Sequence, residues 1–198
     1  MNTSTSSLSE MINSSIVVLT KPSIATFEQY ERRGTTRDAL VYVGIAAAIS
    51  GIAGFLFNLL FGGGVGAAIG GLILGLLGPL VGFGIFAGVL YYVGRQQGGT
   101  GTQDEVFYTC ALYVAPLLAI TGVIGAIPLL GCLLFPVTLL LGLYQIYLGY
   151  LASRSSMNLD QNKAIISVVA AWLAQFIVGL VIASVLTAAL IGTAAAGQ

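Results

Sequence analysis

The sequence predicts an all-α polytopic membrane protein, a bundle of five transmembrane helices preceded by one or two amphipathic helices at the membrane surface. The first observation is composition: 57% of residues are hydrophobic, 7% are charged, and the mean hydropathy is +0.98. The second is that residues 39–94, 106–153 and 164–198 carry no charge. About 20 apolar residues cross a bilayer core, so the first two stretches must each fold back and the third crosses once.

Five crossings divide the chain into three regions. Residues 1–38 form a cytoplasmic N-terminal segment with an amphipathic helix, residues 39–191 form the transmembrane domain, and residues 192–198 form a short external tail. Unbroken apolar runs within these stretches are typical of spanning helices. The expected spans are about 39–61, 65–93, 106–127, 129–151 and 164–191.

The N-terminal segment contains a short helical pattern. Ile24, Phe27 and Tyr30 recur at helical spacing after Ser23, a good N-cap, and an upstream apolar run over 11–19 suggests a second helix. Two placements are open: the helix lies in the membrane interface and buries its apolar face there, or it packs as a soluble helix under the bundle. Residues expected to contact the membrane surface or a partner are Phe27, Tyr30, Arg32 and Arg33.

The positive charges indicate orientation. All lie before the first span or in the connections 94–105 and 152–163, namely Lys21, Arg32, Arg33, Arg37, Arg95, Arg154 and Lys163. Loops rich in Lys and Arg stay cytoplasmic, so the N-terminus is expected inside and the C-terminus outside. All nine tyrosines map to the same side, as an interfacial belt would.

The second span is rich in glycine, and four GxxxG spacings occur along it. Glycine allows helix backbones to approach closely in lipid, so this span is expected to be a tightly packed, central helix. Gly78-Pro79 in its middle indicates either a kink or a discontinuous helix. Gly99, in a loop, is expected to tolerate a large side chain. The expected packing residues are Gly66, Gly70, Gly71, Gly75, Gly78, Pro79, Gly82, Gly84 and Gly88.

The chemistry of the spans argues against catalysis. The chain has no histidine, and no span contains a carboxylate or a cation, so no catalytic, metal-binding or cofactor-binding residue is predicted. A net charge of zero gives no basis for nucleic-acid binding. Cys110 and Cys132 are expected to be two buried, unpaired thiols. Polar side chains at depth are expected to bond between helices, namely Ser50, Asn58, Thr121, Thr138, Gln145, Ser167, Gln175 and Ser184.

Three segments carry a family resemblance. They are LTKPSIATFEQYERRGTTRDALVY before the first span, GGTGTQDEVFYTCALYVAPLL with Tyr113 and Pro116, and IYLGYLASRSSMNLDQNKAIISV with Gly149, Lys163 and Ala164. In this order the chain, over about 18–183, resembles the Yip-domain family of Ypt/Rab-interacting-type five-span proteins in its short prokaryotic form. It lacks the long acidic N-terminal domain of eukaryotic members. The resemblance implies the five-span fold and an address in a prokaryotic plasma membrane, with no established reaction.

Two functions follow as expectations. The first is a non-catalytic integral membrane protein that organises lipids, other membrane proteins or copies of itself through its cytoplasmic face. The alternative is a passive transporter, channel or lipid-handling protein built around the glycine-rich second span.

Overall fold

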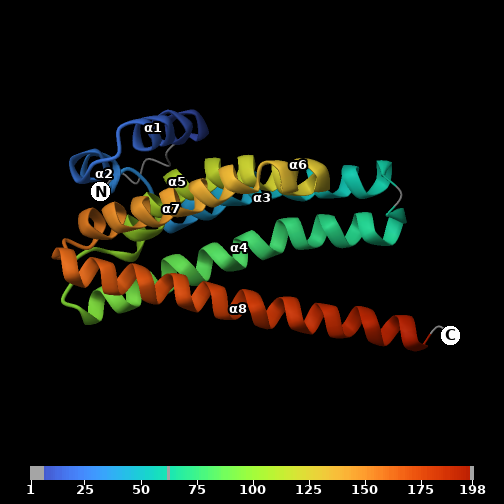
Figure 1. The fold of residues 1–198 in the computed structure, drawn as a ribbon. Coiled ribbons are helices and arrows are strands. Elements are labelled where there is room, and N and C mark those ends of the chain that lie inside the picture. Colours follow the sequence, from blue (N-terminus) through green and yellow to red (C-terminus); the bar gives the residue numbers. More distant parts are fainter. Residues whose placement is uncertain (1–6, 62, 197–198) are drawn as a thin grey trace.

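The computed structural model describes residues 7–61 and 63–196, and within these it contains helices and no strands (Figure 1). The predicted all-α class is therefore confirmed. The helices are α1 (Leu8–Thr20), α2 (Ile24–Tyr30), α3 (Thr36–Leu60), α4 (Gly64–Gln96), α5 (Gln103–Ala126), α6 (Pro128–Leu133), α7 (Phe135–Ser156) and α8 (Gln161–Ala196).

Five of these helices are long and apolar enough to cross a membrane, which confirms the predicted number of spans. They are α3, α4, α5, α7 and the part of α8 over Gln161–Ile182. Figure 1 shows them running alongside one another, with α1 and α2 gathered at one end of the bundle. α1 and α2 are too short to be counted among the spans.

The fourth span begins later than predicted. A short helix, α6, ends at Leu133, and α7 starts at Phe135 with Pro136 in its first turn. Proline has no N–H to donate and fits the first turn of a helix, where no intrahelical partner is needed. The expected single span over 129–151 is thus corrected to two helices, of which only α7 is a spanning candidate.

Capping residues fix where the helices begin at one end of the bundle. Thr35 with Asp38 and Thr102 with Glu105 form capping boxes at the starts of α3 and α5. At the opposite end, the N-cap residues of α4 and α7, Gly63 and Leu134, provide no side-chain cap. Among the described helices, the side-chain caps therefore lie at one end of the bundle.

All charged residues of the chain lie toward that same end. α3 begins there, α4 ends there, α5 begins there, and α7 and α8 meet there, so the connections 94–105 and 152–163 come together beside α1 and α2 (Figure 1). We call this region, made of residues 7–38, 94–105 and 152–163, the polar end.

The best-buried span is α5, not the glycine-rich helix. The most apolar window of α5 is 56% buried, compared with 17% for that of α4. Tyr108, Leu112 and Tyr113 of α5 are within 1% of complete burial and lie in the core with Phe27 and Leu148. The prediction that the second span is central is therefore corrected.

Only part of the predicted glycine packing occurs. A Cβ on Gly75 would lie 2.7 Å from the Cα of Gly51, and one on Gly71 would lie 3.3 Å from the backbone of Gly54, so these glycines bring α3 and α4 together. A Cβ on Gly82 would instead meet the Gln175 side chain of α8 at 3.1 Å. At the other five glycines, no neighbouring atom lies within 4 Å of such a Cβ, so their assignment as packing residues is corrected. These are Gly66, Gly70, Gly78, Gly84 and Gly88.

α4 is a continuous helix across Gly78 and Pro79. The structure therefore forms no discontinuous helix at this position, and Pro79 lies within the span, where the lost backbone hydrogen bond is tolerated.

The connection between α4 and α5 is closely packed. A Cβ on Gly99 would lie 2.7 Å from the Met157 methyl group and 2.8 Å from the Gly94 carbonyl oxygen, and one on Gly101 would overlap the backbone of Ser156. The expectation that Gly99 tolerates a large side chain is wrong, because this loop packs directly on the α7–α8 connection.

The two cysteines are unpaired, as predicted. Cys110 is fully buried, but Cys132 in α6 is exposed. The expectation of two buried thiols is corrected for Cys132, because α6 lies at the end of the bundle away from the core.

Candidate contact surface at the polar end

The N-terminal helices pack on the bundle through apolar side chains. Phe27 of α2 is fully buried, and the centre of its ring lies 6.2 Å from the centre of the Tyr113 ring in an edge-on arrangement. Met11 and Val18 of α1 are also buried in the core. Of the two predicted placements, the structure has the helices packed under the bundle. Phe27 is thus a packing residue, which corrects its assignment to membrane or partner contact.

Hydrogen bonds fix α1 against the spans. The Tyr144 hydroxyl of α7 donates to the Leu19 carbonyl oxygen at 2.6 Å, and the hydroxyls of Ser15 and Tyr42 lie 3.0 Å apart. These contacts join residues 125 and 27 positions apart in the chain, so they hold α1 in one place on the bundle.

Tyr30 and Arg33 form a stacked pair. The Arg33 guanidinium carbon lies 4.8 Å from the centre of the Tyr30 ring, and its Nε donates to the Gln29 carbonyl oxygen at 3.1 Å. Tyr30 is 8% exposed, whereas Arg33 is exposed. Tyr30 therefore supports Arg33, and the guanidinium is the group presented to the surroundings.

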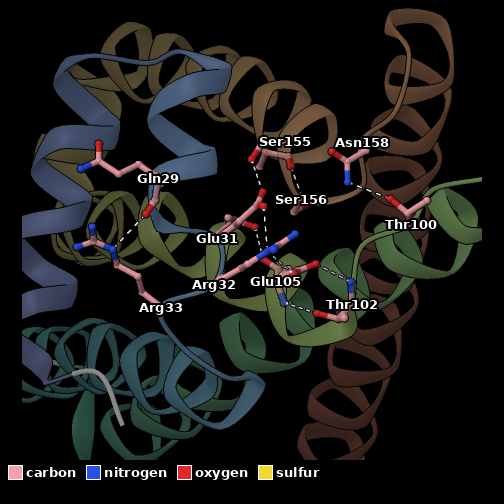
Figure 2. Close-up of polar contacts among 12 residues, drawn as sticks. Gln29, Glu31, Arg32, Arg33, Thr100, Thr102, Glu105, Ser155, Ser156 and Asn158 are labelled. Carbon is pink, nitrogen blue, oxygen red and sulfur yellow. Dashed lines mark hydrogen bonds and ion pairs between the residues drawn. The ribbon is translucent and has the colours of Figure 1, made fainter. Parts of the chain in front are cut away.

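Arg32 lies between two carboxylates (Figure 2). Its Nε is 3.1 Å from Glu105 Oε1 and 3.6 Å from Glu31 Oε1, while its side chain remains 77% exposed. Glu31 also accepts a hydrogen bond at 2.8 Å from the Ser155 hydroxyl. This cluster joins α2, α5 and α7 and fixes the start of the connection to α3.

Glu31 is buried although it is a carboxylate. Burial raises its pKa above the usual 4.5, while the hydrogen bond from Ser155 acts in the opposite direction. The nearby Glu105 carboxylate raises the pKa further, and the Arg32 guanidinium lowers it. Arg32 and Ser155 therefore make an ionised Glu31 tolerable at this position.

Other hydrogen bonds tie the connections of the polar end together. The Thr36 hydroxyl and backbone N–H donate to Asp104 Oδ1 at 2.6 and 2.8 Å. The Asn158 amide donates to the Thr100 hydroxyl at 3.0 Å, as Figure 2 shows. Asn158 has a φ of 52°, in the left-handed region that asparagine tolerates. The polar end is thus built from residues of several elements that the chain brings together.

A hollow of about 450 Å³ lies between α1, the end of α2 and α5. Arg32 and Arg33 line it together with neutral polar side chains of α1 and the Glu10 carboxylate. The sequence predicted three of its residues, Tyr30, Arg32 and Arg33. The sequence did not predict Glu31 and Glu105, the two carboxylates that pair with Arg32; for Glu105, the capping-box spacing from Thr102 was the available signal.

The arrangement suits binding. Two guanidinium groups beside a hollow can pair with a phosphate or a carboxylate, because arginine presents several N–H donors in a fixed plane. Within the described residues, no group of three metal-ligating side chains occurs.

In a comparison with protein families, the chain matches the Yip1 domain over residues 16–183. Neither the curated proteins nor the solved structures contain a match to this chain. The matched range includes all five spanning candidates, α2, and both arginines that line the hollow.

Proposed function

This chain belongs to the Yip1 domain family, and from that premise we propose that it is a non-catalytic integral membrane protein that organises lipids or membrane proteins through its polar end. The observation that carries the proposal is the hollow lined by Arg32 and Arg33. Both arginines are exposed, and the helix before them is anchored in the core by Phe27.

The chemistry of the hollow favours an acidic group on the partner. Arg32 pairs with Glu31 and Glu105, so its side chain is held in position and its charge is partly neutralised. Arg33 pairs with no carboxylate in the described part of the chain. A phosphate or carboxylate held between the two would meet donors from both side chains. Lipid headgroups and acidic protein segments both provide such groups.

The proposal requires the polar end to face the cytoplasm, and this orientation can be tested by labelling. In a Cys110→Ser/Cys132→Ser background, we expect Phe61→Cys, at the opposite end of α3, to react with an impermeant thiol reagent added to intact cells. Asp160→Cys, exposed at the polar end, should react only after the membrane is opened. Labelling of Asp160→Cys in sealed cells would contradict the orientation.

Partner capture tests the function itself. A photoreactive amino acid at Asn13, which lines the hollow, should crosslink a reproducible lipid or protein in intact cells. We expect Arg32→Gln/Arg33→Gln to reduce this crosslinking at least about tenfold, since loss of charge-assisted hydrogen bonds worth about 1.5–3 kcal/mol has that effect. Lys163→Gln, which removes an exposed charge outside the hollow, is the matched control. Unchanged crosslinking in the double variant would refute the role of the arginines.

A further inference from the structure

Two half-buried glutamines lie near the middle of their helices without hydrogen-bond partners among the described residues. Gln145 is on α7 and Gln175 is on α8, at roughly 16 and 21 Å from the polar ends of their helices, at about 1.5 Å per residue. In a bilayer core about 30 Å thick, these depths lie near the middle. No hydrogen bond from either carboxamide to another described residue exists in the structure.

Most of the other polar side chains expected within the spans have hydrogen-bond partners. Each of five donates to a carbonyl oxygen three or four residues earlier in its own helix, namely Asn58, Thr121, Thr138, Ser167 and Ser184. The expected hydrogen bonds between helices are therefore replaced, at these five, by bonds within a helix. The two glutamines and Ser50 have no such bond in the described part of the chain, and an unpaired amide in hydrocarbon is unfavourable.

Both glutamines line the same pair of adjoining hollows. One, of about 410 Å³, lies between α4, α7 and α8, with Gly82, Trp172 and Phe176 among its lining residues. The other, of about 170 Å³, reaches inward to Pro79 and Thr121. α4 and α8 separate toward the C-terminal end of α8 in Figure 1, and residues of both helices line the larger hollow.

The wall of the larger hollow has a further unsatisfied group. The indole Nε1 of Trp172 is buried and has no hydrogen-bond partner among the described residues. Gly82 leaves room for Gln175, whose Nε2 would lie 3.1 Å from a Cβ at that position. Three polar groups without partners thus lie around one hollow in an otherwise apolar region.

We propose that this hollow binds a neutral lipid whose small head carries hydroxyl and carbonyl groups, with the Gln145 and Gln175 carboxamides as its hydrogen-bonding partners. A carboxamide both donates and accepts, so it matches a head that does the same. Every lining residue of the hollow lies in one of the charge-free stretches 39–94, 106–153 and 164–198, so a charged head would be buried there without a counter-ion. This inference does not rest on the function proposed for the polar end.

The apolar surroundings of the site favour a lipid over a water-borne solute. The lining side chains Val81, Ile85 and Leu180 are apolar and lie along helices whose outer faces are apolar and exposed. A lipid with a large or charged head keeps that head at the membrane surface. A lipid with a small neutral head can bring its hydroxyl and carbonyl groups down to the glutamines at mid-bilayer.

Trp172, the single tryptophan of the chain, provides the measurement. The full-length protein is placed in lipid nanodiscs and titrated with one of three probes, all carrying the quenching bromine atoms on their chains. The probes are a dibrominated diacylglycerol, phosphatidylcholine with the same chains, and a brominated alkane without a head. We expect diacylglycerol to quench Trp172 fluorescence with saturation at low mole fraction, and the other two only in proportion to their concentration.

Variants test the named residues. Gln145→Leu/Gln175→Leu should raise the half-saturating mole fraction of diacylglycerol about eightfold, since it removes one hydrogen bond per carboxamide and such bonds in membranes average about 0.6 kcal/mol each. Gly82→Leu should obstruct the hollow, whereas Gly84→Leu, on the same helix with open space beside it, should behave as the unmodified protein.

Three results would overturn the proposal. Quenching by all probes in proportion to concentration would show ordinary lipid contact. Saturation unchanged by the double glutamine variant would show that hydrogen bonding does not hold the lipid. Absence of quenching by every probe would show that the hollow is closed to lipid, and disulfide formation between Gly179→Cys copies would then identify a second copy as its occupant.

Discussion

Gly75→Leu is expected to lower the free energy of unfolding by about 3 kcal/mol, the upper end of the typical cost of overpacking. A Cβ at this position would lie 2.7 Å from the Cα and 3.0 Å from the nitrogen of Gly51. These are backbone atoms of α3, so they cannot turn aside as a flexible side chain would. α3 and α4 would have to separate, and thermal unfolding of the detergent-solubilised protein measures the result.

The same helix offers matched controls. Gly70→Leu and Gly84→Leu place the same side chain on α4 where nothing lies within 4 Å, so both should change the unfolding temperature little. Gly82→Leu should have an intermediate effect, because the neighbouring atoms belong to the Gln175 side chain. If Gly75→Leu and Gly84→Leu unfold at the same temperature, the close contact of α3 with α4 does not contribute to stability.

Phe27→Ala is expected to release the N-terminal helices from the bundle. The ring is fully buried against Tyr113, and removing a buried phenylalanine side chain costs about 3–5 kcal/mol. α1 and α2 are short and depend on this packing, because isolated helices of such length are marginal in water. Hydrogen exchange should therefore accelerate throughout α1 and α2, while the spans keep their protection.

Ile16→Ala serves as the control for this prediction. Ile16 lies on α1 but is 55% exposed, so its truncation should leave exchange in both helices nearly unchanged. Slow exchange in α1 of the Phe27→Ala protein would mean that the hydrogen bonds of Ser15 and Tyr144, not burial of the ring, hold this helix.

Only some of the residues around the hollow at the polar end could be predicted from the sequence. Arg32 and Arg33 were predicted, because exposed arginines beside a helical pattern are recognisable from sequence. The carboxylates that position Arg32 were not, since Glu31 and Glu105 come from α2's end and from α5 and meet only in the folded protein. Phe27 was recognised as a residue to be buried, but the surface that buries it was not.

The sequence by itself determined the number of spans, the helical class and the collection of all charge at one end. These depend on local properties, because each apolar stretch is long enough to cross a bilayer and each charged connection interrupts it. The capping boxes at Thr35 and Thr102 are equally local and are readable as short spacings.

Only the tertiary structure decided which faces of the spans meet. Gly75 packs on Gly51 while Gly84 on the same helix has open space beside it, and α5 rather than α4 is the most buried span. The meeting of Gln145 and Gln175 at one hollow was likewise not visible in the sequence. The physical reason is that lipid is as apolar as a protein core. Hydrophobic periodicity, which marks the buried face of a helix in water, is therefore lost in a membrane.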